Sequence, residues 1–319
     1  MKENNVCLSQ SEEKKDAEQF CGFIGLIGRP NVGKSTLLNK LVGQKVSITT
    51  HKAQTTRNRI LGIRTEKDTQ IIFIDTPGIH RTENLLNRKI VAYAENTLGD
   101  TDLNLWIVQP YPQTSEERHC FSVLHPEDQH ILQMLSDKEK RTVVVLNKID
   151  TLSNGDLLKS IANLDKLGLF AEIVPVSALK SINLNQLIVS LKKYLSPHPF
   201  YFEHHQFTDV TERFLASEFV REEIFLRLRQ EIPYSVAVIV EQFEEDSKCI
   251  KIACVICVER NSQKGIIIGK KGEMLKKIGT GARKKIQSLL GNKVFLKLHV
   301  KILKQWTQNE LHLKSLGFE

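Results

Sequence analysis

Three features that often reveal the class of a protein are missing from this sequence of 319 residues. No run of about 18 apolar residues is present, so the pattern predicts no membrane-spanning helix. The N-terminal stretch is polar and mixed in charge, without the apolar core of a signal peptide, which predicts a cytosolic protein. The six cysteines are scattered, which argues against a disulfide framework. Cys254 and Cys257 form a CxxC inside an apolar run, without a second such pair, so we expect them to pack in a core rather than bind a metal.

What is present fits a globular protein of two domains, because 41% of the residues are hydrophobic and 26% are charged. The basic residues are unevenly distributed. The net charge is +8, but the segment from Lys264 to Lys304 holds twelve Lys or Arg and one acid, Glu273, which makes +11 for this segment and leaves −3 for the rest. A solvated helix face explains part of such an excess, but a patch this one-sided more often binds nucleic acid or anionic lipid.

The first 200 residues alternate short apolar runs with helical patterns. This alternation predicts an α/β fold with a mostly parallel sheet covered on both faces, and ligands at the carboxyl ends of its strands. The expected strands are 23–28, 70–74, 103–110, 141–146 and 171–178. We expect residues 1–20 to be a disordered polar tail and residues 21–196 to form the first domain. Residues 197–208 begin with two closely spaced prolines, which predicts a linker.

Residues 209–319 predict a second, smaller α+β domain. A helical pattern spans 208–231, strand-like runs span 235–243 and 249–260, and a last strand spans 293–303. The stretch 273–291 reads as a basic amphipathic helix that Gly279 and Gly281 interrupt.

The stretch GRPNVGKST, residues 28–36, has the spacing of a phosphate-binding P-loop between a strand and a helix. Its glycines let backbone N–H groups surround phosphate oxygens, and the helix N-terminus adds positive potential. Lys34 would reach the terminal phosphates and Ser35 would bind magnesium. The nucleotide-binding residues expected here are Gly28, Arg29, Pro30, Asn31, Val32, Gly33, Lys34, Ser35 and Thr36.

A second loop, DTPG, follows the next buried strand. Asp75 can hold the magnesium through water, and Gly78 can offer its N–H to a γ-phosphate and move when that phosphate leaves. The residues expected to contact nucleotide here are Asp75, Thr76, Pro77, Gly78 and Ile79.

Two further loops predict that the base is guanine. In NKID, the Asp150 carboxylate can accept from both the ring N–H and the amino group of guanine, a donor pair that adenine lacks. Ser177 and Ala178 end the next strand, where a backbone N–H can reach the guanine carbonyl oxygen. The base-binding residues expected are Asn147, Lys148, Ile149, Asp150, Ser177 and Ala178.

A switch threonine is expected in the segment SITTHKAQTTRNRILGI, closing over magnesium and the γ-phosphate. Thr55 and Thr56 are the candidates, and we favour Thr56, so Ser35, Thr56 and Asp75 form the expected magnesium site, and Lys34, Thr56 and Gly78 the expected hydrolytic set. Ile79 stands where Ras-type switches place a glutamine that orients water. Isoleucine lacks that function, so we expect slow intrinsic hydrolysis, roughly 10⁻⁴ to 10⁻² s⁻¹.

The second domain contains a GxxG turn, Gly269–Gly272, between three isoleucines and the basic helix. In KH modules such a turn clamps about four nucleotides of single-stranded RNA. The glycines allow close approach of the backbone, lysines neutralise phosphates, and the apolar surface receives bases. The RNA-binding residues expected are Ile266, Ile267, Ile268, Gly269, Lys270, Lys271, Gly272, Lys276 and Lys277.

With these motifs in this order, the chain resembles the bacterial Era GTPases over residues 21–319. The matching stretches are residues 28–63, DTPGIH, NKID, PYSVAV and residues 258–279. The resemblance implies a Ras-like GTPase domain followed by a type II KH domain, with GTP or GDP and Mg²⁺ as ligands. It also implies K⁺ held in part by Asn31, a monomer that binds the 3′ region of 16S rRNA during small-subunit assembly, and a fraction at the inner face of the cell membrane.

The sequence departs from the family at two places. Ser181 stands where the family usually has glycine after SAxx, and an insertion is expected around residues 118–126.

Three alternative functions stay open from the sequence. An RNA chaperone with nucleotide binding but negligible turnover would retain both domains. A tRNA-modification GTPase lacks the KH domain, and a P-loop small-molecule kinase would not need NKID.

Overall fold

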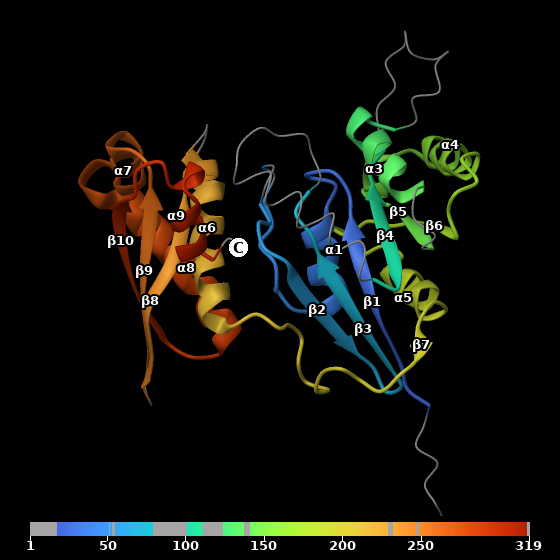
Figure 1. Cartoon of the computed structure of the whole chain (residues 1–319), viewed down its shortest axis with the longest axis horizontal. Helices are drawn as coiled ribbons and strands as arrows, with labels where there is room; N and C mark the ends of the chain where they lie inside the picture. Colours follow the sequence, from blue (N-terminus) through green and yellow to red (C-terminus); the bar gives the residue numbers. More distant parts are fainter. Residues whose placement is uncertain are drawn as a thin grey trace, which may run out of the picture.

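The computed structural model of the chain describes residues 18–50, 52, 55–78, 101–110, 124–136, 141–228, 232–246 and 249–317. Within these ranges two α/β units lie side by side, joined by the chain around residue 200 (Figure 1). None of the helices in these ranges is long and apolar enough to cross a membrane. The expected tail up to residue 17, Ile79 and the expected insertion up to residue 123 lie outside the described residues.

The first unit is built on one sheet, with the strand order β2-β3-β1-β4-β5-β6 and β7 paired to β1. β2 and β7 run antiparallel to their neighbours, while the other pairs are parallel, which confirms the mostly parallel sheet. β3, β4 and β5 are buried along their whole length, as expected for central strands that helices cover on both faces. The strands are β1 (Phe20–Ile27), β2 (Ile60–Thr65), β3 (Thr69–Asp75), β4 (Leu103–Val108), β5 (Thr142–Leu146), β6 (Glu172–Pro175) and β7 (Ser196–Pro197).

β2 is a strand that the sequence reading did not separate from the switch segment. It forms a hairpin with β3, closed by a hydrogen bond from the Glu66 N–H to the Thr69 carbonyl at 2.7 Å. Ile60, Leu61 and Ile63 are buried in this hairpin, so the end of the predicted switch segment is part of the sheet.

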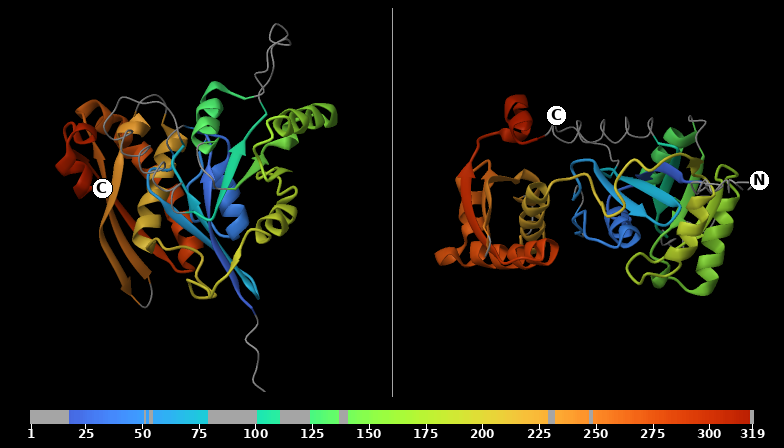
Figure 2. Two further views of the ribbon diagram at one scale, coloured as in Figure 1. Left: turned by 45° about the vertical axis from the view of Figure 1, so that its right-hand side comes forward. Right: turned by 90° about the horizontal axis from the view of Figure 1, so that it is seen from below.

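Helices cover both faces of this sheet, as the second view in Figure 2 shows. α1 (Lys34–Val42) and α5 (Leu184–Lys192) pack on one face, and α3 (Pro126–Ser136) and α4 (Asn154–Asp165) pack on the other. A short 3₁₀ turn, η2 (Ile149–Thr151), follows β5. α1 begins after Gly33 and ends at Gly43, whose left-handed conformation (φ 81°) closes the helix through a hydrogen bond to the Asn39 carbonyl.

The segment predicted as a linker lies against the sheet rather than away from it. Gln70 on β3 accepts hydrogen bonds from the N–H groups of Tyr201 and Phe202 at 2.9 and 3.0 Å. Thr208 forms an isolated bridge with Gly62 on β2. These contacts fix where the chain enters the second unit.

The second unit has a three-stranded sheet in the order β10-β9-β8, with β9 parallel to β10 and antiparallel to β8. This arrangement confirms the α+β fold of the second domain. Its core is formed by the sheet and the helices α6, α7 and α8. The elements are α6 (Glu212–Arg227), η3 (Ile232–Ser235), β8 (Ala237–Asp246), β9 (Cys249–Val258), α7 (Asn261–Ile268), η4 (Lys270–Gly272), α8 (Glu273–Leu290), β10 (Val294–Ile302), η5 (Trp306–Gln308) and α9 (Glu310–Ser315).

The predicted interruption of α8 is wrong, because the helix continues through Gly279 and Gly281. Both glycines are places of close approach. A Cβ at Gly281 would lie 2.0 Å from the Glu223 Oε2 of α6, and one at Gly279 would lie 3.3 Å from Leu298 of β10. The glycines therefore serve helix and sheet packing rather than a break in the helix.

The two cysteines of the CxxC are both buried in β9. Cys254 belongs to the core under the helices, whereas Cys257 packs with Trp306 and Leu313 on the other face of the sheet. Burial raises the pKa of the Cys254 thiol to about 12. The two thiols thus lie on opposite faces of the sheet, and each packs in a core as expected.

Candidate nucleotide and RNA sites

The phosphate loop lies between β1 and α1, at the carboxyl edge of the sheet. Gly33 has φ 103°, and a Cβ there would lie 2.3 Å from the Asn147 amide nitrogen, so no other residue fits. The buried Lys34 ammonium donates to the carbonyls of Gly28 and Arg29 at 2.7 and 3.0 Å. Burial lowers the pKa of Lys34 to about 8, against the attraction of Asp75 and Asp128.

Three hydroxyl groups converge on one carboxylate oxygen at the end of β3. Ser35 and Ser47 donate to the Asp75 Oδ2 at 2.8 and 2.9 Å, and Thr56 does so at 3.4 Å. Ser35 and Thr56 also lie 2.9 Å from each other. Burial raises the pKa of Asp75, although Lys34 and the three hydroxyls oppose the shift.

This cluster fits a magnesium ion. The other carboxylate oxygen of Asp75 is buried and has no hydrogen-bond partner among the described residues, so it is available to a cation or a water molecule. All the side-chain atoms that meet in this cluster are hard oxygen ligands of the type that Mg²⁺ prefers. The predicted residues Ser35, Thr56 and Asp75 are thus brought together, and Ser47 is a fourth member that the sequence reading missed.

The geometry distinguishes the two candidate switch threonines. The Thr56 side chain points to Ser35 and Asp75, and its residue is buried. The Thr55 hydroxyl instead bonds within its own loop, to Thr50 at 2.6 Å and to the Lys52 carbonyl at 2.7 Å. Thr56 is therefore the better placed of the two for magnesium.

The base-recognition loops are held together by side-chain hydrogen bonds. The Asn147 amide donates to the Val32 carbonyl at 2.8 Å and accepts from the Ala178 N–H at 3.0 Å. The Ser177 hydroxyl donates to the Asp150 carboxylate at 2.5 Å, which fixes the group that would face guanine. Hydrogen bonds thus connect three loops into one site: the NKID loop (residues 147–150), the loop that carries Ser177 and Ala178, called the SA loop, and the P-loop.

Lys148 covers the loop at Asn31. Its ammonium donates to the Asn31 carbonyl at 2.7 Å and to the Gln109 side chain at 2.5 Å. Asn31 and Lys148 both have positive φ, 64° and 65°, which for residues other than glycine is uncommon and typical of functional loops. Gln109 is not among the nucleotide-site residues predicted from the sequence.

The other predicted nucleotide residues shape the loops. Val32 is buried in the core and offers its carbonyl, and the Thr76 hydroxyl donates to the Leu26 carbonyl at 2.7 Å. A Cβ at Gly78 would lie 2.8 to 2.9 Å from Pro30, so the DTPG loop packs directly on the P-loop. Along the same edge lie the half-buried Thr36, the buried Pro77 and the half-buried Ile149.

A buried ion pair missed by the sequence reading anchors the P-loop to α3. Arg29 donates to Asp128 at 2.9 Å, and both residues are almost fully buried. Burial raises the pKa of the Asp128 carboxyl, while the Arg29 guanidinium opposes that shift. The residues are 99 apart in sequence, so no local pattern indicates the pair.

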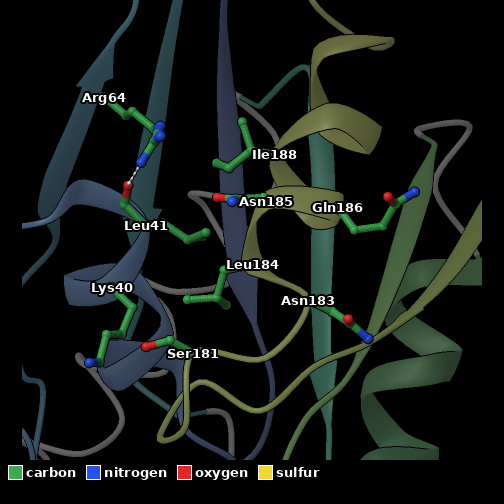
Figure 3. Close-up of a pocket in the computed structure, with 9 residues that line it drawn as sticks. All are labelled: Lys40, Leu41, Arg64, Ser181, Asn183, Leu184, Asn185, Gln186 and Ile188. Atoms are coloured by element: carbon green, nitrogen blue, oxygen red, sulfur yellow. Dashed lines mark hydrogen bonds between the residues drawn. The ribbon is translucent and has the colours of Figure 1, made fainter.

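A cavity of about 480 Å³ opens beside the SA loop, between α1, β2 and α5 (Figure 3). Arg64 lines it and donates to the neighbouring Leu41 carbonyl at 2.7 Å. Ser181 and Asn183 also line it, and their φ angles are 58° and 59°. Ser181 thus adopts the left-handed conformation that favours glycine. None of the residues that line this cavity belongs to the P-loop.

The GxxG turn of the second domain joins α7 to α8 through η4. Gly269, Lys271 and Gly272 have φ angles of 73°, 52° and 80°, and a Cβ at Gly269 would lie 2.7 Å from Met274. The turn opens onto a groove of about 460 Å³ between α8 and β10. Its lining combines apolar and basic side chains, Gly272, Leu275, Lys276, Gly279, Thr280, Arg283, Leu296 and Leu298.

The structure corrects one of the expected RNA contacts. Ile267 is fully buried in the domain core, so its side chain supports the turn from within and does not reach a ligand. Its neighbour Ile266 is 47% exposed, and Ile268 is half-buried against the core. The four predicted lysines, Lys270, Lys271, Lys276 and Lys277, are exposed, whereas Arg283, Leu296 and Leu298 of the groove were not predicted.

The two domains meet at a buried carboxylate on α6. Glu222 is 1% exposed and accepts hydrogen bonds from Lys45 at 2.7 and 2.9 Å and from the Thr49 N–H at 2.9 Å. It also pairs with Lys285 of α8 at 2.6 Å. Burial acts to raise the pKa of Glu222, but the hydrogen bonds from Lys285, Lys45 and Thr49 outweigh burial and lower that pKa.

The segment around the switch threonines makes further contacts with the second domain. Arg57 is buried and donates to the carbonyls of Val236 and Tyr234, both at 2.8 Å. Arg221 of α6 donates to the Thr55 carbonyl. The segment that contributes to the magnesium cluster is thus also part of the domain interface.

Sequence models of two protein families match the chain. The model described as a 50S ribosome-binding GTPase matches residues 23–148, and the KH domain model matches residues 231–307.

Curated relatives extend over nearly the whole chain. GTPase Era of Syntrophus aciditrophicus is 46% identical over 299 residues, 93% of this chain and 94% of that protein. GTPase Era of Geotalea daltonii is 46% identical over 304 residues, 95% of this chain and 99% of that protein.

Two solved structures share the whole fold, each with a TM-score of 0.86, 36% identity, and coverage of 94% of this chain and 99% of the other. One is Era in complex with MgGDPNP and nucleotides 1506–1542 of 16S ribosomal RNA. The other is a variant of Aquifex aeolicus Era bound to GDP·AlF4⁻.

Proposed function

Because the chain belongs to the Era family of GTPases, we propose that it is a GTP-controlled RNA-binding protein of small ribosomal subunit assembly. As a GTPase it hydrolyses GTP to GDP and phosphate. In this proposal residues 21–196 bind the nucleotide, residues 197–208 connect the two domains and residues 209–319 bind RNA.

One observation carries the proposal. The segment from Ser47 to Arg57 contacts the magnesium cluster through Ser47 and Thr56 and contacts the KH domain through Thr49 and Arg57. A change of nucleotide that moves this segment must therefore change contacts on both sides. Switch segments ordered by a γ-phosphate and released after hydrolysis are the usual device of such proteins.

In the nucleotide site, Lys34 binds the terminal phosphates and Gly78 lies on the γ-phosphate side. Ser35, Thr56 and Asp75 hold Mg²⁺, which neutralises charge on the phosphates when it is bound. Asp150, oriented by Ser177, recognises guanine. Since the Ala178 N–H is already bonded to Asn147, we propose the following N–H, that of Leu179, as the donor for the guanine oxygen.

In the RNA site, single-stranded RNA occupies the groove between α8 and β10. The GxxG turn approaches the phosphates and Lys270, Lys271, Lys276 and Lys277 neutralise them. The related Era that was solved with nucleotides 1506–1542 of 16S rRNA supports the 3′ region of that RNA as the target.

Further parts of the proposal depend on the family resemblance. They are a K⁺ ion held in part by Asn31, a monomeric state, and a cytosolic location with a fraction at the inner face of the membrane. Hydrolysis with K⁺ and with Na⁺, and Asn31→Ala as control, tests the first; equal rates in the two salts would contradict it.

Crosslinking of the protein to RNA in cells, followed by sequencing, tests the cellular role. We expect fragments from the 3′ region of 16S rRNA, and their loss in a Lys276→Glu/Lys277→Glu variant. A footprint on other RNAs would contradict the proposal. GTP hydrolysis by the protein and by Lys34→Ala, measured in parallel, tests the enzymatic part, and equal rates would remove it.

A further inference from the structure

β10 is the edge strand of the KH sheet, as Figure 1 shows, and its two faces differ. Leu296 and Leu298 point toward α8 and line the RNA groove. The intervening residues point to the opposite face, because side chains alternate along a strand. Those residues are Phe295, Lys297, His299 and Lys301, and all four are exposed. We call these four residues the outer stripe of β10.

The rest of this face of the sheet is covered. Trp306 and Leu313, which follow β10 in the chain, pack on Val255 and Cys257 of β9 and on Ala237 of β8. Across from Phe295 on β9 lies Lys251, which is also exposed. The C-terminal segment thus shields the centre of the face and leaves the outer stripe open.

The outer stripe combines cations with an aromatic ring. Lys297 and Lys301 form no ion pair with any described residue. Phe295 is 61% exposed, an unusual exposure for so large an apolar side chain. Lysines alone could serve only to keep an edge strand from pairing with another chain, but an exposed phenylalanine works against that purpose.

We propose that the outer stripe of β10 is a second contact site for single-stranded RNA, beyond the GxxG groove. This inference rests on the proposed RNA binding in the groove. A strand that leaves the groove passes the edge of β10, because the same strand forms the groove wall with its inner face. On the outer face Phe295 stacks on a base, and Lys297 and Lys301 neutralise phosphates.

The chemistry of the outer stripe matches this ligand. RNA-binding sheets present aromatic side chains on strands for base stacking, and single-strand binders combine such rings with a basic track. Lys297 and Lys301 lie on one strand about 13 Å apart, from a rise of about 3.3 Å per residue, so they follow an extended backbone rather than form a compact cluster.

Two RNAs separate the two contact sites. The first is a ten-nucleotide RNA from the 3′ end of 16S rRNA, and the second carries the same ten nucleotides flanked by six uridines at each end. Affinities are measured by fluorescence anisotropy at several salt concentrations, with the full chain and a GTP analogue. The variants are Lys297→Gln/Lys301→Gln and Phe295→Ser. The charge-matched control is Lys159→Gln/Lys166→Gln, whose exposed lysines lie on and just after α4 in the other domain.

We expect the flanked RNA to bind more tightly than the short RNA to the unchanged protein. Each outer-stripe variant should lose about tenfold in affinity for the flanked RNA and nothing for the short one. The double lysine variant should also reduce the salt slope for the flanked RNA by about 1.4, from about 0.7 per phosphate contact. The α4 control should leave both affinities unchanged.

Unchanged affinity of both variants for the flanked RNA would overturn the inference. So would a loss of binding to anionic phospholipid vesicles in the same variants with RNA affinity intact, because the outer stripe would then serve a membrane surface. A separate measurement tests the proposed RNA binding in the groove. If the groove does not bind RNA, Lys276→Gln/Lys277→Gln will leave the affinity for the short RNA unchanged.

Discussion

The backbone N–H of Thr49, beside the magnesium cluster, donates a hydrogen bond to the Glu222 carboxylate of the KH domain at 2.9 Å. The same carboxylate pairs with Lys45 of the GTPase domain and with Lys285 of α8, the helix that follows the GxxG turn. A single buried group thus contacts both the segment that leads to Thr56 and the helix that lines the groove proposed for RNA. In the proposed function, this arrangement is a direct physical route from the nucleotide site to the RNA groove.

Replacement of Glu222 by alanine should destabilise the protein by about 2–3 kcal/mol, because two lysines lose a buried partner while keeping partial access to water. Urea unfolding measures the effect. Glu245→Ala, at an exposed carboxylate of β8, is the matched control and should change the free energy of unfolding by less than about 0.5 kcal/mol. Equal effects of the two changes would mean that Glu222 contributes no more than a surface carboxylate.

Asp150→Asn should weaken GTP binding and shift preference toward xanthine nucleotides, since the amide presents a donor where the carboxylate accepts. Ser177→Ala should leave this preference unchanged but weaken GTP binding about five- to tenfold, because the Asp150 carboxylate loses the hydroxyl that orients it. Competition between GTP and XTP for each variant provides the measurement. Unchanged specificity in Asp150→Asn would contradict the assignment of guanine.

GTP affinity should fall as pH rises from 7 to 9. The pKa of Lys34 is lowered to about 8, so the ammonium that attracts phosphate is present at pH 7 and is lost above pH 8. Since bound phosphate favours the charged form, affinity should decrease by at most about tenfold per pH unit above the pKa. Lys34→Ala should show a weaker pH dependence over this range, and parallel curves for both proteins would exclude Lys34 as the titrating group.

Ser181→Gly should stabilise the protein by about 1 kcal/mol, because φ of 58° strains a residue with a Cβ but not glycine. Thermal unfolding should show a higher Tm. In Ser288→Gly, at an exposed position inside α8, glycine should instead lower stability by about 0.5 kcal/mol. A loss of stability at both serines would show that Ser181 makes favourable contacts that outweigh its strain.

The sequence predicted the features that short-range patterns encode. The P-loop, DTPG, NKID and GxxG each lie within a few residues, and strand ends of a parallel sheet meet at one edge, so Ser35, Asp75 and Asp150 could be assigned to one site. Their contacts with Thr56 and Ser177 agree with that assignment geometrically.

Features that depend on the path of the chain were missed. Glu222 and Thr49 are 173 residues apart, and no pattern around α6 distinguishes Glu222 from its neighbours Glu218 and Glu223. Gly281 was wrongly predicted to interrupt α8. It leaves space for Glu223 of α6, a contact that the local sequence does not indicate. The burial of Ile267 within a run of three isoleucines depends on which face of α7 meets the core.

The affinity for RNA in each nucleotide state tests the account most directly. The ten-nucleotide RNA from the 3′ end of 16S rRNA is titrated into the protein loaded with a GTP analogue or with GDP, and the affinities for both nucleotides are measured with and without RNA. Because linkage is reciprocal, RNA should raise the ratio of GTP-analogue affinity to GDP affinity by the same factor by which the GTP analogue, compared with GDP, raises RNA affinity, about 5- to 150-fold. Equal RNA affinity in the two nucleotide states would contradict the control of RNA binding by GTP.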